Sequence, residues 1–81
     1  MNDILLIEDD EGIIKLLQVH LREPAFRLTS CMGGVEGLAV FKTQNFHLSI
    51  SLKRSIPAIA RVLFKESAKA AAGFYYGPAA H

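Results

Sequence analysis

The chain has 81 residues, of which 51% are hydrophobic and 21% charged, and its net charge is +1. This length predicts one small domain, and the composition excludes a disordered chain. The balanced charge gives no support to a nucleic-acid partner, and no apolar run approaches the ~20 residues of a membrane span. A single cysteine, Cys31, excludes an internal disulfide, and the start lacks the features of a signal peptide, so we expect a cytoplasmic protein.

The first fifty residues alternate predicted strands and helices. We expect strands at residues 3–7, 26–31 and 46–52, and helices at residues 11–22 and 35–43. One helix fits between each pair of successive strands, which is the pattern of parallel strands joined by right-handed crossovers. The predicted fold class is therefore α/β, with a doubly wound parallel sheet.

Beyond Leu52 this pattern is lost. Residues 1–50 carry seven acids and four bases, whereas residues 51–81 carry five bases and one acid. We expect a loop at residues 53–55, a helix at residues 58–72 that Gly73 ends, and an aromatic turn at residues 74–78, with no fourth strand. The chain is thus predicted to consist of an alternating portion, 1–52, and a basic, alanine-rich helical tail, 53–81. Four bases lie close to one helical stripe and predict a solvated charged face: Arg54, Arg61, Lys65 and Lys69.

Three carboxylates follow the first apolar strand directly: Glu8, Asp9 and Asp10. A buried strand that ends in acids places them at the carboxyl edge of a parallel sheet, where open α/β folds build their sites. Clustered like charges need a cation or a protonated member to be tolerated. The alternative is that Asp10 caps the following helix while its neighbours favour the positive helix end. The sequence leaves both interpretations open.

Residues 1–50 resemble the start of a response-regulator receiver domain, the phosphoaccepting module of two-component signalling. The resemblance rests on Ile4-Leu5-Leu6-Ile7-Glu8-Asp9-Asp10-Glu11, on the helix Ile13 to Leu21, on Phe26-Arg27-Leu28-Thr29-Ser30-Cys31, on Gly34-Val35-Glu36-Gly37-Leu38 and on Asn45-Phe46. It implies a five-stranded, flavodoxin-like sheet. The chain length leaves room for about three strands with two or three helices, so we expect a truncated version of that sheet.

The resemblance also implies a site. It assigns magnesium binding to Glu8 and Asp9, with Asp10 adjacent, and a phosphoacceptor aspartate at about Leu52. No carboxylate occurs between Glu36 and Glu66, so the acceptor is absent and magnesium binding is expected to be weak. Ser51 lacks a positioned base and is expected to be a solvated strand residue.

His47 stands where the family often has another acid, but at the wrong end of the strand. The family's later hydroxyl residue and lysine have no matching positions in this chain.

The functional prediction is a receiver-like fragment of a phosphorelay that is neither an enzyme nor phosphorylatable as written. Its partners by resemblance are a sensor histidine kinase or another receiver domain. The alternatives are a non-catalytic pseudo-receiver that binds partners through its first helix, and a truncated or frameshifted product without function. We also expect self-association through a sheet edge that missing strands would otherwise cover.

Overall fold

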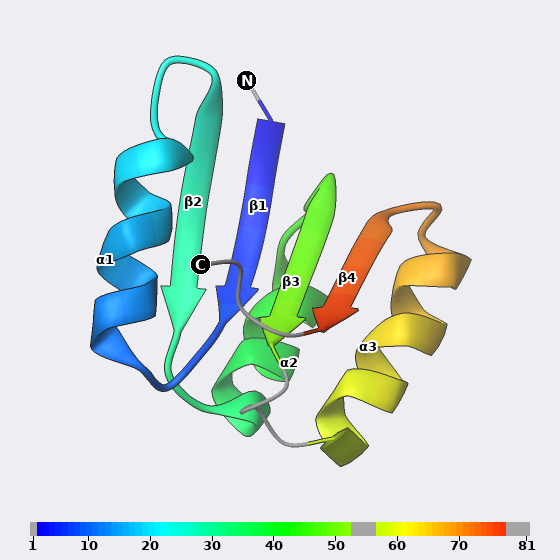
Figure 1. Cartoon of the computed structure of the whole chain (residues 1–81). Helices are drawn as coiled ribbons and strands as arrows, with labels where there is room; N and C mark the ends of the chain where they lie inside the picture. Colours follow the sequence, from blue (N-terminus) through cyan, green and yellow to red (C-terminus); the bar gives the residue numbers. More distant parts are fainter. Residues whose placement is uncertain (1, 53–56, 78–81) are drawn as a thin grey trace.

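Strands and helices alternate along the chain in the computed structural model (Figure 1). The structure describes residues 2–52 and 57–77, with all their side chains except those of residues 57–59. The elements are β1 (Asn2–Ile7), α1 (Glu11–His20), β2 (Phe26–Cys31), α2 (Gly34–Thr43), β3 (Leu48–Leu52), α3 (Pro57–Lys69) and β4 (Gly73–Gly77). No helix in the described ranges is long and apolar enough to cross a membrane.

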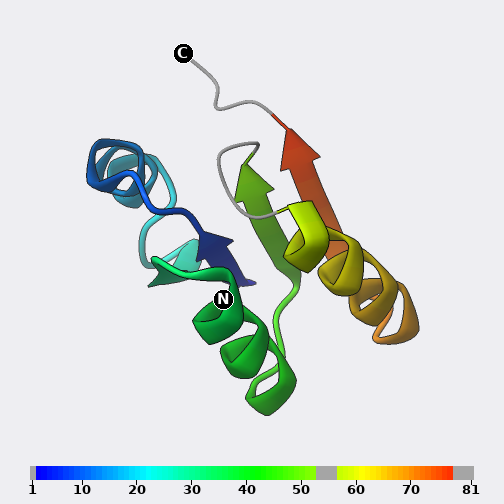
Figure 2. The ribbon, with the colours of Figure 1, turned by 90° about the horizontal axis from the view of Figure 1, so that it is seen from below.

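All four strands belong to one parallel sheet, in the order β2-β1-β3-β4. Figure 2 shows α1 on one face of this sheet and α2 and α3 on the other. Central β1 with crossovers to both sides is the arrangement of a doubly wound, flavodoxin-like fold. The predicted fold class is confirmed, and the described residues contain one strand more than the three that the sequence indicated.

The additional strand is β4, so the prediction of an aromatic turn without a fourth strand is wrong. Phe74 lies opposite Ser49 and Tyr76 opposite Ser51 in parallel register. The Gly73 N–H donates to the His47 carbonyl oxygen at 2.9 Å, which starts this pairing. Aromatic residues favour a pleated, half-buried surface, and here that preference prevails over the turn-forming tendency of the flanking glycines.

Helix α3 ends earlier than predicted, at Lys69 rather than at residue 72. The Ala72 N–H donates to the Ser67 carbonyl at 2.9 Å, and the Ala71 N–H donates to the Ala68 carbonyl at 3.3 Å. These two bonds form a Schellman motif, whose central residue adopts the left-handed conformation. That residue is Ala71, with φ of 55°. Gly73, expected to end the helix, begins β4 instead.

The main core lies between the sheet and the layer of α2 and α3. It is formed by buried Leu5, Ile7, Cys31, Phe46 and Leu63, with Leu38, Val40, Phe41 and Phe74 packed against them. Helix α2 comes so close to β1 that a Cβ at Gly37 would overlap the side chain of Ile7. The absence of a side chain at Gly37 therefore sets the distance between helix and sheet.

Strand β3 presents two serines to this core. Ser49 and Ser51 are fully buried, as is Ser67 of α3. None of the three hydroxyl oxygens has a hydrogen-bond partner in the described structure. An unsatisfied buried polar group costs about 1–3 kcal/mol, so these hydroxyls reduce the stability gained by packing α3 on β3.

The remaining boundaries differ from the predictions by a few residues. Helix α1 ends at His20 rather than at residue 22, and β3 begins at Leu48 rather than at residue 46. Phe46 lies in the connection between α2 and β3, and its side chain packs in the core. The strand therefore begins after it. The predicted loop at residues 53–55, which includes Arg54, and residues 78–81 lie outside the described residues.

Replacing Ala71 by glycine should stabilise the protein. A non-glycine residue in the left-handed region costs about 1–2 kcal/mol, which glycine avoids. Part of this gain in stability is offset because glycine loses more backbone entropy on folding. We expect Ala71→Gly to raise the free energy of unfolding by about 0.5–1 kcal/mol, measured by urea denaturation. The control Ala68→Gly, at an exposed position within α3, should lower it by about 1 kcal/mol. A loss of stability in Ala71→Gly would contradict the assigned helix end.

Candidate functional site

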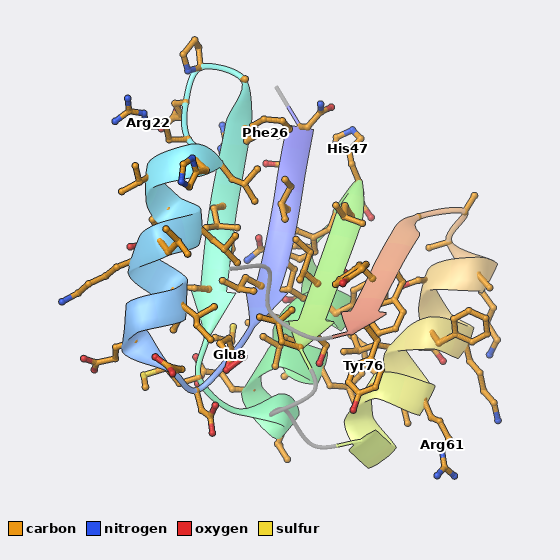
Figure 3. All side chains as sticks on the ribbon, viewed as in Figure 1. Glu8, Arg22, Phe26, His47, Arg61 and Tyr76 are labelled. Atoms are coloured by element: carbon orange, nitrogen blue, oxygen red, sulfur yellow. The ribbon has the colours of Figure 1, made fainter. Side chains whose placement is uncertain are left out.

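The three carboxylates emerge together where β1 ends. The Glu8 N–H donates to the Cys31 carbonyl at 2.9 Å, which extends the pairing of β1 with β2 by one residue. Glu8 is fully buried, Asp10 is half-buried and Asp9 is exposed. Figure 3 shows Glu8 at the carboxyl edge of the sheet, the edge at which the sequence predicted the acids to lie.

Asp10 begins helix α1. Its Oδ1 accepts hydrogen bonds from the N–H groups of Gly12 at 2.8 Å and Ile13 at 3.3 Å. The backbone of Asp10 is extended, as an N-cap requires. The capping interpretation of Asp10 is therefore correct, and this oxygen is committed to holding the helix start.

Glu8 has a different environment. Its Oε1 accepts a hydrogen bond from the Asp10 N–H at 3.3 Å, whereas Oε2 is buried and without a hydrogen-bond partner. Burial raises the pKa of Glu8 above its ordinary value of 4.5. The neighbouring Asp9 carboxyl raises the pKa further, and the bond from the Asp10 amide opposes the shift. Folding thus stabilises the protonated form of the Glu8 carboxyl group relative to the unfolded chain.

These carboxylates supply few fixed oxygens to a cation. Magnesium prefers near-octahedral oxygen coordination, commonly from one or two carboxylates with water or phosphate. Among residues 2–52 and 57–77, no three histidine, cysteine, aspartate or glutamate side chains are gathered closely enough to hold a metal ion. One orphaned oxygen on Glu8 beside an exposed Asp9 fits a magnesium ion poorly. Weak magnesium binding at Glu8, Asp9 and Asp10 stays a prediction.

The end of β3 lies next to the same edge. Ile7 pairs with Ser51, so the following residues, Glu8 and Leu52, are neighbours where the two strands end. Leu52 is only 4% exposed and presents an apolar side chain where the resemblance expects the acceptor aspartate. Ser51 is fully buried, so its predicted exposure to solvent is wrong: its side chain faces the core beneath α3.

His47 and Cys31 take no part in the carboxylate cluster. His47 Nδ1 accepts a hydrogen bond from the Asp3 N–H at 3.0 Å, at the opposite edge of the sheet (Figure 3). Cys31 is buried in the core, and burial raises the pKa of its thiol, to which the nearby Glu36 carboxyl adds. Cys31 is therefore a neutral core residue.

A cleft that sequence reasoning missed lies at the amino-terminal edge, away from the carboxylates. Its volume is about 680 Å³, and its lining includes Asp3, Lys42, His47, Glu66 and Lys69. Lys69 and Glu66 form an ion pair at 3.6 Å. These residues come from three stretches that are distant in sequence, so only the folded chain brings them together. Their mixed charges select no class of ligand.

Neither protein-family models nor curated proteins give a match to this chain.

Replacing Glu8 by glutamine should change how stability depends on pH. Because the pKa of Glu8 is raised on folding, its contribution to stability is complete below 4.5 and is lost as the pH rises through the folded pKa. We expect Glu8→Gln to be more stable than the unmodified chain at neutral pH, with an advantage that shrinks toward pH 4.5. Urea denaturation across this range measures the difference.

The matched control for this measurement is Glu23→Gln, which alters an exposed carboxyl group and should leave the pH dependence unchanged. Equal pH dependence in Glu8→Gln and the unmodified chain would show that burial does not raise the pKa of Glu8.

Proposed function

We propose that this protein is a receiver-like module of a two-component phosphorelay that binds its partners without accepting a phosphoryl group. The observation that carries this proposal is the carboxyl edge of the sheet. There, buried Glu8 and exposed Asp9 follow β1 and lie beside the end of β3, and that strand ends in buried Leu52. Acids thus stand where the resemblance assigns magnesium binding, and no carboxylate stands at the end of β3, where it expects the phosphoacceptor.

The strand order supports the receiver part of the proposal. A sheet ordered β2-β1-β3-β4, with α1 on one face and α2 and α3 on the other, brings the ends of β1 and β3 to the same switch point. In receiver domains this point holds the acids after the first strand and the acceptor after the third. The same geometry occurs in unrelated flavodoxin-like proteins, so the acids and not the fold make the proposal specific.

The chemistry of β3 supports the non-phosphorylatable part. A leucine cannot form an acyl phosphate. Ser51 is buried, and its hydroxyl has no partner that could act as a base. The carboxylates described at this edge have other roles. Asp10 caps α1, and Glu8 is buried with a raised pKa.

The proposed partners are a sensor histidine kinase or another receiver domain. Helix α1 offers the contact surface, because Leu16 is 48% and Val19 58% exposed on a helix that buries Ile14 against the sheet. Exposed apolar residues on an amphipathic helix are typical of surfaces that bind another protein.

Incubation with a small-molecule phosphodonor and magnesium, followed by intact-mass measurement, tests the proposal. The unmodified chain should gain no adduct of about 80 Da, the mass of one phosphoryl group. Leu52→Asp places a carboxylate beside Glu8 and should gain an acid-labile adduct that depends on magnesium. Leu48→Asp, at the amino end of the same strand, is the matched control and should gain none.

An adduct on the unmodified chain would contradict the non-phosphorylatable part of the proposal. A folded Leu52→Asp variant that behaves like Leu48→Asp would contradict the receiver-like part. Circular dichroism of both variants establishes whether they are folded.

A further inference from the structure

Strand β4 is an edge of the sheet, because the strand order ends there. The Gly73 N–H points to β3, where it binds the His47 carbonyl. Main-chain groups of successive strand residues point to alternate sides, so those of Phe74 and Tyr76 point away from β3. The edge therefore offers two N–H and two C=O groups to a further strand.

Within β4 itself, two of the features by which proteins protect exposed strands are absent. The five residues of β4 include no charged side chain and no proline. Natural edge strands are usually shielded by charges, proline, bulges or a covering segment. Tyr76 is 37% exposed at the end of the strand, and Figure 3 shows it near the carboxyl edge.

Helix α3 provides a second surface beside the edge. Phe64 contacts Phe74, with ring centroids 6.3 Å apart, yet 63% of Phe64 is exposed. Arg61 precedes Phe64 by three residues and thus shares its side of the helix. Figure 3 shows Arg61 directed away from the sheet, and Lys65, next to Phe64, is also exposed. An aromatic and basic flank, formed by Phe64, Arg61 and Lys65, thus adjoins the outer edge of β4.

Glu66, the acidic residue in the described part of α3, does not neutralise Arg61 and Lys65. Glu66 follows Phe64 by two positions, which places it on nearly the opposite side of the helix. It pairs there with Lys69 at 3.6 Å. The flank that adjoins β4 therefore favours an acidic partner.

We propose that the outer edge of β4 binds an extended acidic segment of a partner protein as a fifth strand. Main-chain hydrogen bonds to Phe74 and Tyr76 hold the segment. Its apolar side chains contact Phe64, and its carboxylates contact Arg61 and Lys65. This surface is separate from the carboxylate site after β1 and does not depend on the function proposed for that site.

A second copy of this chain is a less favourable occupant. Two β4 strands that pair about a twofold axis would run antiparallel, with both α3 helices on the same face of the joined sheet. Arg61 and Lys65 of one copy would then approach the same residues of the other. Like charges at such a contact oppose association, whereas an acidic strand meets complementary charge.

The test uses the full chain and a short fluorescent peptide that alternates valine with glutamate. We expect saturable binding by fluorescence anisotropy, which weakens as salt is added. Binding should be lost when the peptide is N-methylated on its hydrogen-bonding side. On binding, amide hydrogen exchange of Phe74 and Tyr76, followed by NMR, should slow.

Charge reversal on the protein gives a matched pair of variants. Arg61→Glu should weaken peptide binding by about tenfold. Arg22→Glu changes the net charge equally at an exposed position on the other side of the molecule (Figure 3) and should leave binding unchanged.

Three results would overturn the proposal. The first is equal binding of a peptide that alternates valine with lysine, and the second is undiminished binding of the N-methylated peptide. The third is concentration-dependent protection of the Phe74 and Tyr76 amides without peptide, which would identify a second copy as the occupant.

Discussion

The burial of β1 on both faces is the constraint on which the rest of the molecule depends. Residues Ile4–Ile7 are all buried, between β2 on one side and β3 on the other. Helix α2 approaches β1 at Gly37, where no side chain separates the two. Because β1 is enclosed in this way, the backbone reaches the surface only where the strand ends. The position of Glu8 at the carboxyl edge follows directly from the burial of the four residues before it.

That position decides the character of the site. Glu8 continues the pairing of β1 with β2 and is buried with it, whereas Asp10 is far enough along the chain to cap α1. Three adjacent acids thus differ in their surroundings: Glu8 is buried, Asp9 is exposed and Asp10 caps α1. Each acid is engaged differently, and in the described part of the chain no three metal-ligating side chains gather around them. The side chain of Leu52 beside them is apolar and buried. On the function proposed above, this edge would carry acids after β1 and no acceptor at the end of β3.

Sequence reasoning succeeded where the hydrophobic period was strong and failed where tertiary contacts decided the outcome. The bounds of β2 followed from local residue patterns, which also offered the cap at Asp10 as one of two interpretations. Strand β4 did not, because its pairing with β3 comes from residues distant in sequence, and its flanking glycines resemble turn residues. The burial of Glu8 and Ser51 was also beyond local patterns, since both depend on the layers that cover the sheet.

The central claim is that residues 57–77 complete a parallel sheet on β3. Inter-strand nuclear Overhauser effects in the isotope-labelled full chain test it most directly. The structure predicts cross-peaks that link Ile50 to Tyr75 and Ser51 to Tyr76, in parallel register, alongside those that link β1 to β2. Cross-peaks between β1 and β2 without any between β3 and residues 73–77 would contradict the fourth strand, and with it the binding edge proposed for β4.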